Sequence, residues 1–557
     1  MKRLTRMLTL LLSLALIAGA CGSDEGDDAA PSATTVAAAA LAATTTVAPV
    51  AEAPVAEAPV AEAAAVSGPE GTLRVGVSRF QFETLDPAKA GPATHGYWDP
   101  MYDYFFDNDG SEIRGGLIDE WTSSDDGLTW VFHVREGVTW HNGRELDAED
   151  IKWNFDWMQT RQHDTALVLK DNIQSVEVSG PSEVTLVLGE PVPLLLDWLS
   201  ATSSYALTPR EYKDTTTEDW LANPIGSGPF RYVDHSIGEF ILYEAVDEHW
   251  RKVSEFAELL MTVVPEDSTR LAMLSRGEVD LIDSPLSSMP EVEASDANLN
   301  IISVKQAVTA GVILSGVYNE DAPGYDPDRP WAKIEVREAL NLAVDKQAII
   351  DVILFGQAEP AIAASVLPWQ LGWNDSWEPH PYDPERAKQL LADAGYPDGF
   401  SVTVHAYPRP GIPDLPLVIE AVAADWSRLG LDVEIFPSDW GIARPVIRSG
   451  EADFMTGHSL GVFAADLDRV LWNAPNRWFE NSESIDAALV DLQAAATRDE
   501  IAVAISAVTD AVHAEFAWVP VAIVNQVFVS NADTIGDVPI VAHAGGLNHL
   551  EYVTHAP

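Results

Sequence analysis

The sequence has almost no cysteine and few basic residues. Cys21 is the only cysteine among 557 residues, so no disulfide can form within one chain. The 33 Lys and Arg residues face 86 Asp and Glu residues, which gives a formal net charge of −53. A surface this acidic repels the phosphates of nucleic acids, so nucleic acid is excluded as a partner. We interpret the acidity chiefly as an aid to solubility or an adaptation to saline surroundings.

The apolar run near the N-terminus is too short to span a bilayer. It extends from Leu8 to Ala18 behind three basic residues, whereas spanning takes about 20 apolar residues. This pattern is typical of a secretory signal peptide. The following segment, LIAGAC, resembles a bacterial lipobox, in which the signal is removed before the cysteine and the thiol is acylated. The sequence therefore predicts a signal peptide over residues 1–20 and a lipid anchor at Cys21. The alternative is a secreted protein with an incidental cysteine.

Residues 21–70 lack the large side chains that a core requires. They consist mainly of Ala, Thr, Pro and acidic residues, with a VAEAP repeat around Val50 to Ala63. Such a composition cannot bury enough apolar surface to fold, and its prolines keep the chain extended. We expect a disordered tether that holds the folded part away from the membrane.

From Gly71 onward the chain has the patterns of a mixed α/β protein. Alternating apolar residues in GTLRVGV and TWVFHVR predict strands, and Asp147 is placed to cap the helix AEDIKWNFDWMQ. SVTVHAY, LPLVIEAVAADWSRLG and LDVEIF predict a strand, a helix and a strand, the spacing of a βαβ crossover with parallel strands. The stretch from Ser482 to Glu515 is predicted to be mostly helical, and VPVAIVNQVFVS to return as a strand.

Five segments carry a resemblance to a known family. They are LDP at 85–87, LIDEWTSSDDGLTWVFHVREGVTWHNGRELDAEDIKWNFDWM at 117–158, NPIGSGPFRYV at 223–233, VREALNLAVDKQAIIDVILFGQAEPA at 336–361 and YDPERAKQLLADAGYPDGF at 382–400. In this order they resemble the landmarks of the family 5 extracellular solute-binding proteins, which are the peptide, nickel and oligosaccharide receptors of ABC importers. The resemblance covers nearly the whole chain from Gly71.

The resemblance implies a two-lobed periplasmic-binding-protein fold of the large type, with mixed sheets flanked by helices. Domain I would comprise residues 71–90, 206–300 and 516–557. An extra domain II would be inserted at residues 91–205, and domain III would comprise residues 301–515. A small solute, peptide or related, would be enclosed between the two main lobes by hinge closure and passed to a membrane permease. No cofactor is expected, and the protein would lie outside the cytoplasm, anchored to the outer face of the cell membrane.

The resemblance also indicates candidate ligand contacts. In the family, the chain just after the LDP segment borders the pocket, and an aspartate-tryptophan pair precedes a helix of the second main lobe. The corresponding residues are Gly91, Ala93, Thr94 and His95, and Trp440 after Asp439.

One segment departs from the pattern of peptide receptors. These usually have Gly-Trp followed closely by an aspartate that pairs with the amino terminus of the peptide. Here His458 follows Gly457, and the first acidic residues are Asp466 and Asp468. Either aspartate could meet a cationic group. The abundance of tryptophan keeps an oligosaccharide open as the alternative ligand.

The same segment contains an enzyme-like pattern. GHSLG matches the G-x-S-x-G nucleophile elbow of α/β-hydrolases, with Ser459 as nucleophile. Candidate partners in the required order are Asp466 or Asp491, then His513 or His543. The residues after the elbow are large, and no HGGG-like segment precedes the serine. For metals, no HExxH pattern or cluster of ligands is present, so no metal site is expected.

A fluorophosphonate probe separates the hydrolase from the binding protein. We expect the intact protein to remain unlabelled, because no chemistry is needed to bind and release a solute. Ser459→Ala is the matched control, and labelling that disappears in this variant would establish the hydrolase.

Overall fold

The computed structural model describes residues 68–557, apart from gaps at residues 81–82, 90–93, 109–111, 161–168, 170–171, 201–205, 318–322, 363–365, 409–411, 440–441, 444, 447–448, 460–482, 496 and 540–546. The main sheet has the strand order β15-β14-β16-β12-β17-β11-β1-β10-β9-β8, and β13 pairs with β17 beside this path. Among the described helices, none is long and apolar enough to cross a membrane.

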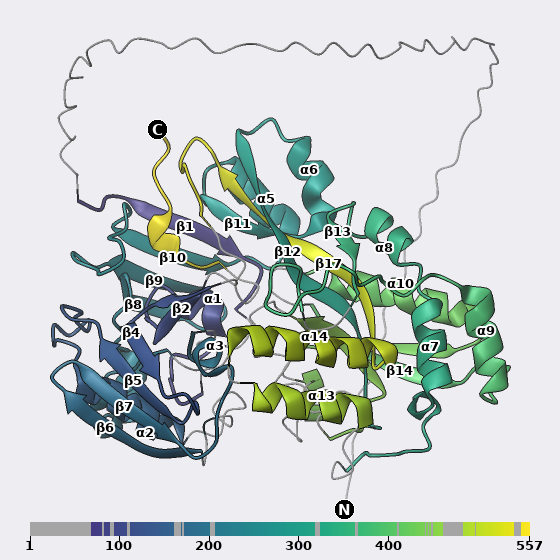
Figure 1. Ribbon diagram of the computed structural model, residues 1–557. Helices are drawn as coiled ribbons and strands as arrows, with labels where there is room; N and C mark the ends of the chain where they lie inside the picture. Colours follow the sequence, from purple (N-terminus) through teal and green to yellow (C-terminus); the bar gives the residue numbers. More distant parts are fainter. Residues whose placement is uncertain are drawn as a thin grey trace, which may run out of the picture. The chain divides into compact units, whose positions relative to one another are not determined.

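Two long strands form the centre of this sheet. β12 (Leu299–Leu314) and β17 (Trp518–Asn531) pair antiparallel along most of their length and lie side by side in Figure 1. The ladder is interrupted between Val304 and Val308, where Gln306 adopts a left-handed φ of 52°. The side chain of Asn525 accepts a hydrogen bond from the Gln306 amide at 3.0 Å. A second register shift lies between Ala310 and Gly311, so the two strands lack regular pairing at two places.

One end of the pair carries the elements that we name domain I. Their strands are β1 (Thr72–Val77), β8 (Phe230–Ser236), β9 (Phe240–Ala245), β10 (Glu258–Val263) and β11 (Leu281–Ser284). Their helices are α1 (His95–Trp98), α4 (Thr217–Ala222), α5 (Asp267–Ser275) and α6 (Met289–Glu293). β1 pairs in parallel with both β10 and β11, and β11 pairs antiparallel with β17. The predicted return of the C-terminal strand to an earlier sheet is therefore confirmed.

The elements that we name domain II form a separate sheet. β4 (Ile118–Ser123), β5 (Thr129–Val134), β7 (Glu183–Leu188) and β6 (Ile173–Gly180) are antiparallel, with α2 (Ala148–Met158), α3 (Leu195–Ser200) and the small pair β2 (Phe106–Asn108) and β3 (Ile113–Gly115). The predicted cap of α2 is confirmed, because the Asp147 side chain accepts from the amides of Glu149 and Asp150. Arg144 donates to both carboxylates of Asp150 and Glu211, which gives the RELDAED segment a structural role.

The elements that we name domain III contain the predicted crossover. β14 (Ser401–Ala406), α10 (Leu415–Arg428) and β15 (Asp432–Pro437) form it, and β14 pairs in parallel with β15 and with β16 (Phe454–Ser459). The remaining elements are β13 (Ala358–Pro360), α7 (Ile334–Leu342), α8 (Lys346–Val352), α9 (Pro384–Asp393), α13 (Glu483–Ala494) and α14 (Arg498–Ala514). The βαβ prediction and the helical stretch after Ser482 are thus confirmed.

Candidate ligand-binding site

The carboxyl ends of parallel strands mark a candidate site in each main domain. In domain III, β14, β15 and β16 run in parallel, so their carboxyl ends share one edge of the sheet. In domain I, β1, β10 and β11 do the same. Open α/β sheets bind ligands in the crevice outside the carboxyl ends of their strands.

Asp414 joins these two edges. It ends the loop that leaves the carboxyl end of β14, and it directly precedes α10. Its carboxylate accepts hydrogen bonds from the Leu286 amide at 2.8 Å and from the Ser287 hydroxyl at 2.7 Å. Both donors lie just beyond the carboxyl end of β11. The carboxyl edges of domains I and III therefore face each other, and Asp414 is only 3% exposed between them. Burial raises its pKa above the ordinary value.

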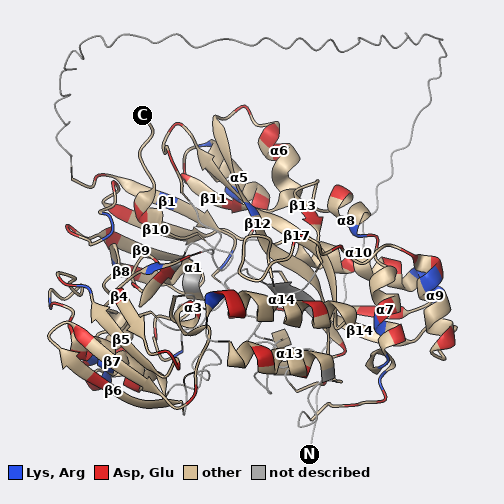
Figure 2. Ribbon diagram, viewed as in Figure 1, with Lys and Arg blue, Asp and Glu red and all other residues tan. Residues whose placement is uncertain are grey.

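A second contact joins domains II and III. Asp197 of α3 lies 3.8 Å from the guanidinium of Arg498, the first residue of α14. Asp197 is 6% exposed. Burial raises its pKa to about 6, and the positive charge of Arg498 only partly opposes this. Figure 2 shows the basic start of α14 beside α3, on a fold in which acidic residues greatly outnumber basic ones.

Only some of the predicted ligand-contact residues lie in the part of the chain that the structure describes. Thr94 is buried immediately before α1, which starts at His95 and packs into the core of domain I. The backbones of Gly457 and His458 lie in β16, opposite Gly311 and Ala310 of β12. The other predicted contacts, namely Gly91, Ala93, Trp440, Asp466 and Asp468, and the predicted lipidation site Cys21, lie outside the described residues.

The hydrolase interpretation gains no support from the described residues. Ser459 is the last residue of β16 and still pairs with Thr309, whereas a nucleophile elbow places its serine on a sharp turn after the strand. His513 lies in the last turn of α14 with its ring stacked on His380, at 3.8 Å between ring centroids. Asp491 lies on α13, and the other two candidates, Asp466 and His543, are outside the described residues.

Sequence reasoning missed Asp414 and Asp197. A sequence signal existed for Asp414, since aspartate before Leu-Pro is typical of a helix start. Nothing in the spacing indicates that its partners are Leu286 and Ser287, which lie more than 120 residues earlier. Asp197 sits in an apolar stretch, where an acidic residue is unusual, but its partner Arg498 is equally remote.

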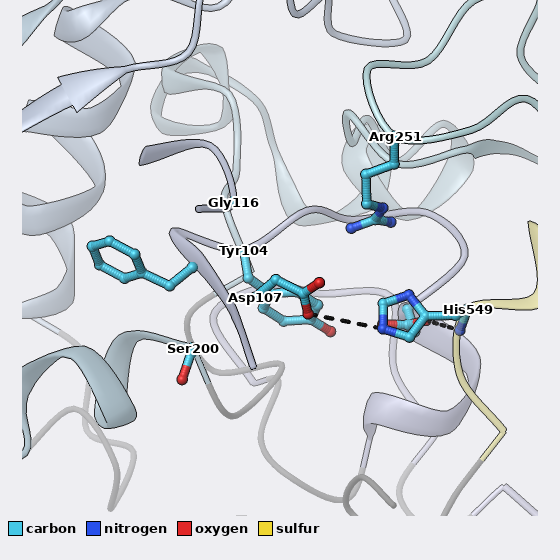
Figure 3. A pocket seen from close by; sticks show the side chains of 8 residues that line it. Tyr104, Asp107, Gly116, Ser200, Arg251 and His549 are labelled. Carbon is cyan, nitrogen blue, oxygen red and sulfur yellow. Dashed lines mark hydrogen bonds and ion pairs between the residues drawn. The ribbon is translucent and has the colours of Figure 1, made fainter. Parts of the chain in front are cut away.

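A small cavity lies beside a buried ionic cluster (Figure 3). Its volume is about 10 Å³, and it is lined by Asp99, Tyr104, Phe106, Asp107, Gly116, Ser200, Arg251 and His549. Ligand pockets usually measure about 300–1,000 Å³, so this one suits a single water molecule and not a solute. We therefore assign it a structural role.

Arg251 is the centre of this cluster. Its guanidinium lies 3.1 Å from the carboxylate of Asp103 and 3.2 Å from that of Glu551, and both carboxylates are fully buried. His549 lies 3.5 Å from Glu551 and 3.8 Å from Asp107. Burial lowers the pKa of His549, but the hydrogen bond to Glu551 and the charge of Asp99 outweigh this effect and raise it to about 9. The cluster thereby fastens the C-terminal segment to residues near the start of the folded chain.

The architecture defines a class of protein. Two α/β lobes, joined by a pair of long strands and facing each other with their carboxyl edges, form the two-lobed fold of periplasmic binding proteins. Comparison with solved structures agrees. The periplasmic binding protein DppA of Helicobacter pylori, solved in complex with the peptide STSA, superposes with a TM-score of 0.74 at 21% identity, covering 88% of this chain and 98% of that one.

Sequence comparison gives the family. Residues 112–477 match the model of the bacterial extracellular solute-binding proteins, family 5. Heme-binding protein A of Haemophilus influenzae is 28% identical over 75% of this chain and 80% of its own length. The dipeptide-binding protein of Escherichia coli is 30% identical over 61% of this chain and 66% of its own. The chain belongs to the family 5 bacterial extracellular solute-binding proteins.

The ionic cluster predicts a specific pH dependence of stability. Because folding raises the pKa of His549 from 6.5 to about 9, its contribution is complete below pH 6.5 and is lost as the pH rises through 9. We expect the difference in unfolding free energy between the parent and His549→Asn to shrink by about 2 to 3 kcal/mol from pH 6 to pH 10. Asparagine tolerates the left-handed φ of 52° at this position.

Urea unfolding at a series of pH values measures this difference. His555→Asn, in the same C-terminal segment, controls for the loss of an imidazole. A difference for His549→Asn that stays constant with pH would show that folding leaves the pKa of His549 unchanged.

Proposed function

We propose that this solute-binding protein captures a peptide or a related small solute between domains I and III and delivers it to the permease of an ABC importer. The observation that carries the proposal is the Asp414 contact, which places the carboxyl edges of the two domains face to face. β12 and β17 connect the domains, and their pairing is irregular at two places, between Val304 and Val308 and between Ala310 and Gly311, where a hinge could bend. A ligand held between the edges would stabilise the closed form, which the permease would then recognise.

Several relatives support a peptide as the ligand. Besides the dipeptide-binding protein of Escherichia coli, a di/tripeptide-binding protein of Pseudomonas aeruginosa is 28% identical over 63% of this chain. A glutathione-binding protein of Salmonella typhimurium is 28% identical over 58% of this chain. The relative named for heme binding shows that sequences this similar differ in ligand. An oligosaccharide is not favoured, because none of these relatives is named for one.

The ligand contacts remain part of the proposal. Domain I would contribute the chain from Gly91 to His95, and domain III would contribute Trp440, Gly457, His458 and one of Asp466 and Asp468. Gly457 lies opposite Gly311, so two neighbouring strands have no side chains at this level of the sheet. The space beside Gly311 is filled by Trp518 and the backbone of Val519, which pack closely against this glycine. Binding would need no covalent step and no cofactor.

We also propose that the protein is held outside the cytoplasm by a lipid on Cys21. The basic and apolar N-terminus, the LIAGAC segment and the tether of residues 21–70 support this proposal. Two or more acyl chains at Cys21 would hold the receptor firmly near its permease, whereas one chain would not.

A thermal-shift screen tests the ligand class. Dipeptides and tripeptides, maltooligosaccharides and nickel ions are added in parallel to the purified protein. We expect only peptides to raise the melting temperature, since a ligand at one hundred times its Kd stabilises the folded state by about 2.7 kcal/mol. A shift with oligosaccharides alone would replace the peptide assignment, and no shift with any class would argue against solute capture.

Detergent partition tests the anchor. In bacterial cells, the parent protein should incorporate labelled palmitate and enter the detergent phase of Triton X-114. Cys21→Ser should lose the label completely and stay in the aqueous phase. Recovery of the parent in the aqueous phase without label would exclude the lipid anchor.

A further inference from the structure

Domain III meets its two neighbours through buried carboxyl groups. Asp197 belongs to α3 of domain II and reaches Arg498 of domain III. Asp414 belongs to domain III and reaches Leu286 and Ser287 of domain I. Both contacts join segments that are remote in sequence, and both bury the aspartate to more than nine-tenths. These contacts would be broken if the domains moved apart.

The groups that contact these two carboxyl groups compensate a negative charge only in part. Asp414 is held by two uncharged donors, and Asp267 at the start of α5 adds a second negative charge nearby, although Asp267 itself pairs with Arg270. Among the residues that the structure describes, the cation paired with Asp197 is Arg498, at 3.8 Å, and the side chain of that arginine is 46% exposed to water. Water screens such a cation, so it compensates only part of the cost of burying a charge.

From this geometry we propose that Asp197 and Asp414 act as proton-dependent clasps, which release protons when the domains open and take them up when the domains close. Resting on the proposed function, this inference adds that closure of the receptor is favoured in mildly acidic surroundings. The two aspartates are positioning residues that act on the domains and do not touch the ligand.

The direction and size of the effect follow from Asp197. In the open form its carboxyl group would face water, with a pKa near the ordinary 3.8, whereas the contact raises the pKa to about 6. The closed form therefore binds protons more tightly, and its advantage is lost as the pH rises through 6. These two pKa values give a ratio of closed to open molecules that is about tenfold larger at pH 5 than at pH 7.

Because Cys21 is the only cysteine in the sequence, spin labels can be attached at chosen positions once it is replaced. In the full chain carrying Cys21→Ser, Glu183→Cys on β7 and Val490→Cys on α13 place one spin label on domain II and one on domain III. Val490 is 59% exposed, so a label there is accommodated. Pulsed electron resonance then measures the distribution of distances between the labels at pH 5 and pH 7, without any ligand.

Three further variants sharpen the test. Asp197→Asn keeps the shape of the side chain but cannot titrate, so most of the response to pH should disappear. Arg498→Glu changes an exposed residue at the start of α14 and places a second acid beside Asp197, so the closed population at pH 7 should fall. Asp499→Asn, the next position along α14, removes a similar charge outside the contact and should keep the full tenfold response.

Three results would contradict the proposed role of Asp197 and Asp414. A parent with equal closed fractions at pH 5 and pH 7, an Asp197→Asn variant with the parental response, or an Arg498→Glu variant as closed as the parent would each overturn the proposal. Since no ligand is used, these results are independent of the peptide assignment. A receptor that binds peptides but ignores pH would retain the proposed function and lose only the clasps.

Discussion

The backbone pairing of β12 with β17 is the constraint on which the rest of the structure depends. One end of the pair is continued by β11 and the strands of domain I, and the other by β16 and the parallel strands of domain III. The two strands cannot slip past each other without breaking many backbone hydrogen bonds at once. The pairing is irregular at Gln306, whose amide donates to the Asn525 side chain, and again between Ala310 and Gly311, so we expect bending of the pair to occur at these two places.

Local features of the fold were predictable from the sequence because their causes are local. Asp147 caps α2 through bonds that reach only three residues along the chain, and Gly430 ends α10 with a φ of 100° that few other residues adopt. The βαβ crossover follows from the same kind of pattern. Family resemblance supplied the arrangement of the lobes, which no local pattern contains.

The site was much less predictable, because its contacts join distant segments. Asp414, Leu286 and Ser287 meet only after β11 and β14 have taken their places in one sheet. The sequence shows an aspartate in front of a helix, and local reasoning assigns such a residue to capping. In the structure its side chain caps nothing in α10 and instead reaches another domain. Burial, which raises the pKa of Asp414, is a property of the assembled fold.

Domain I is assembled from the beginning, the middle and the end of the chain, and this has a consequence for secretion. β1 needs β10 and β11 beside it, and β11 needs β17, more than 240 residues later. Arg251 and Asp103 likewise wait for Glu551, near the last residue. A chain that crosses a membrane from its N-terminus cannot complete this domain until its C-terminus has emerged. For a chain exported in this way, domain I would be completed last, once β17 and the segment that carries Glu551 have crossed.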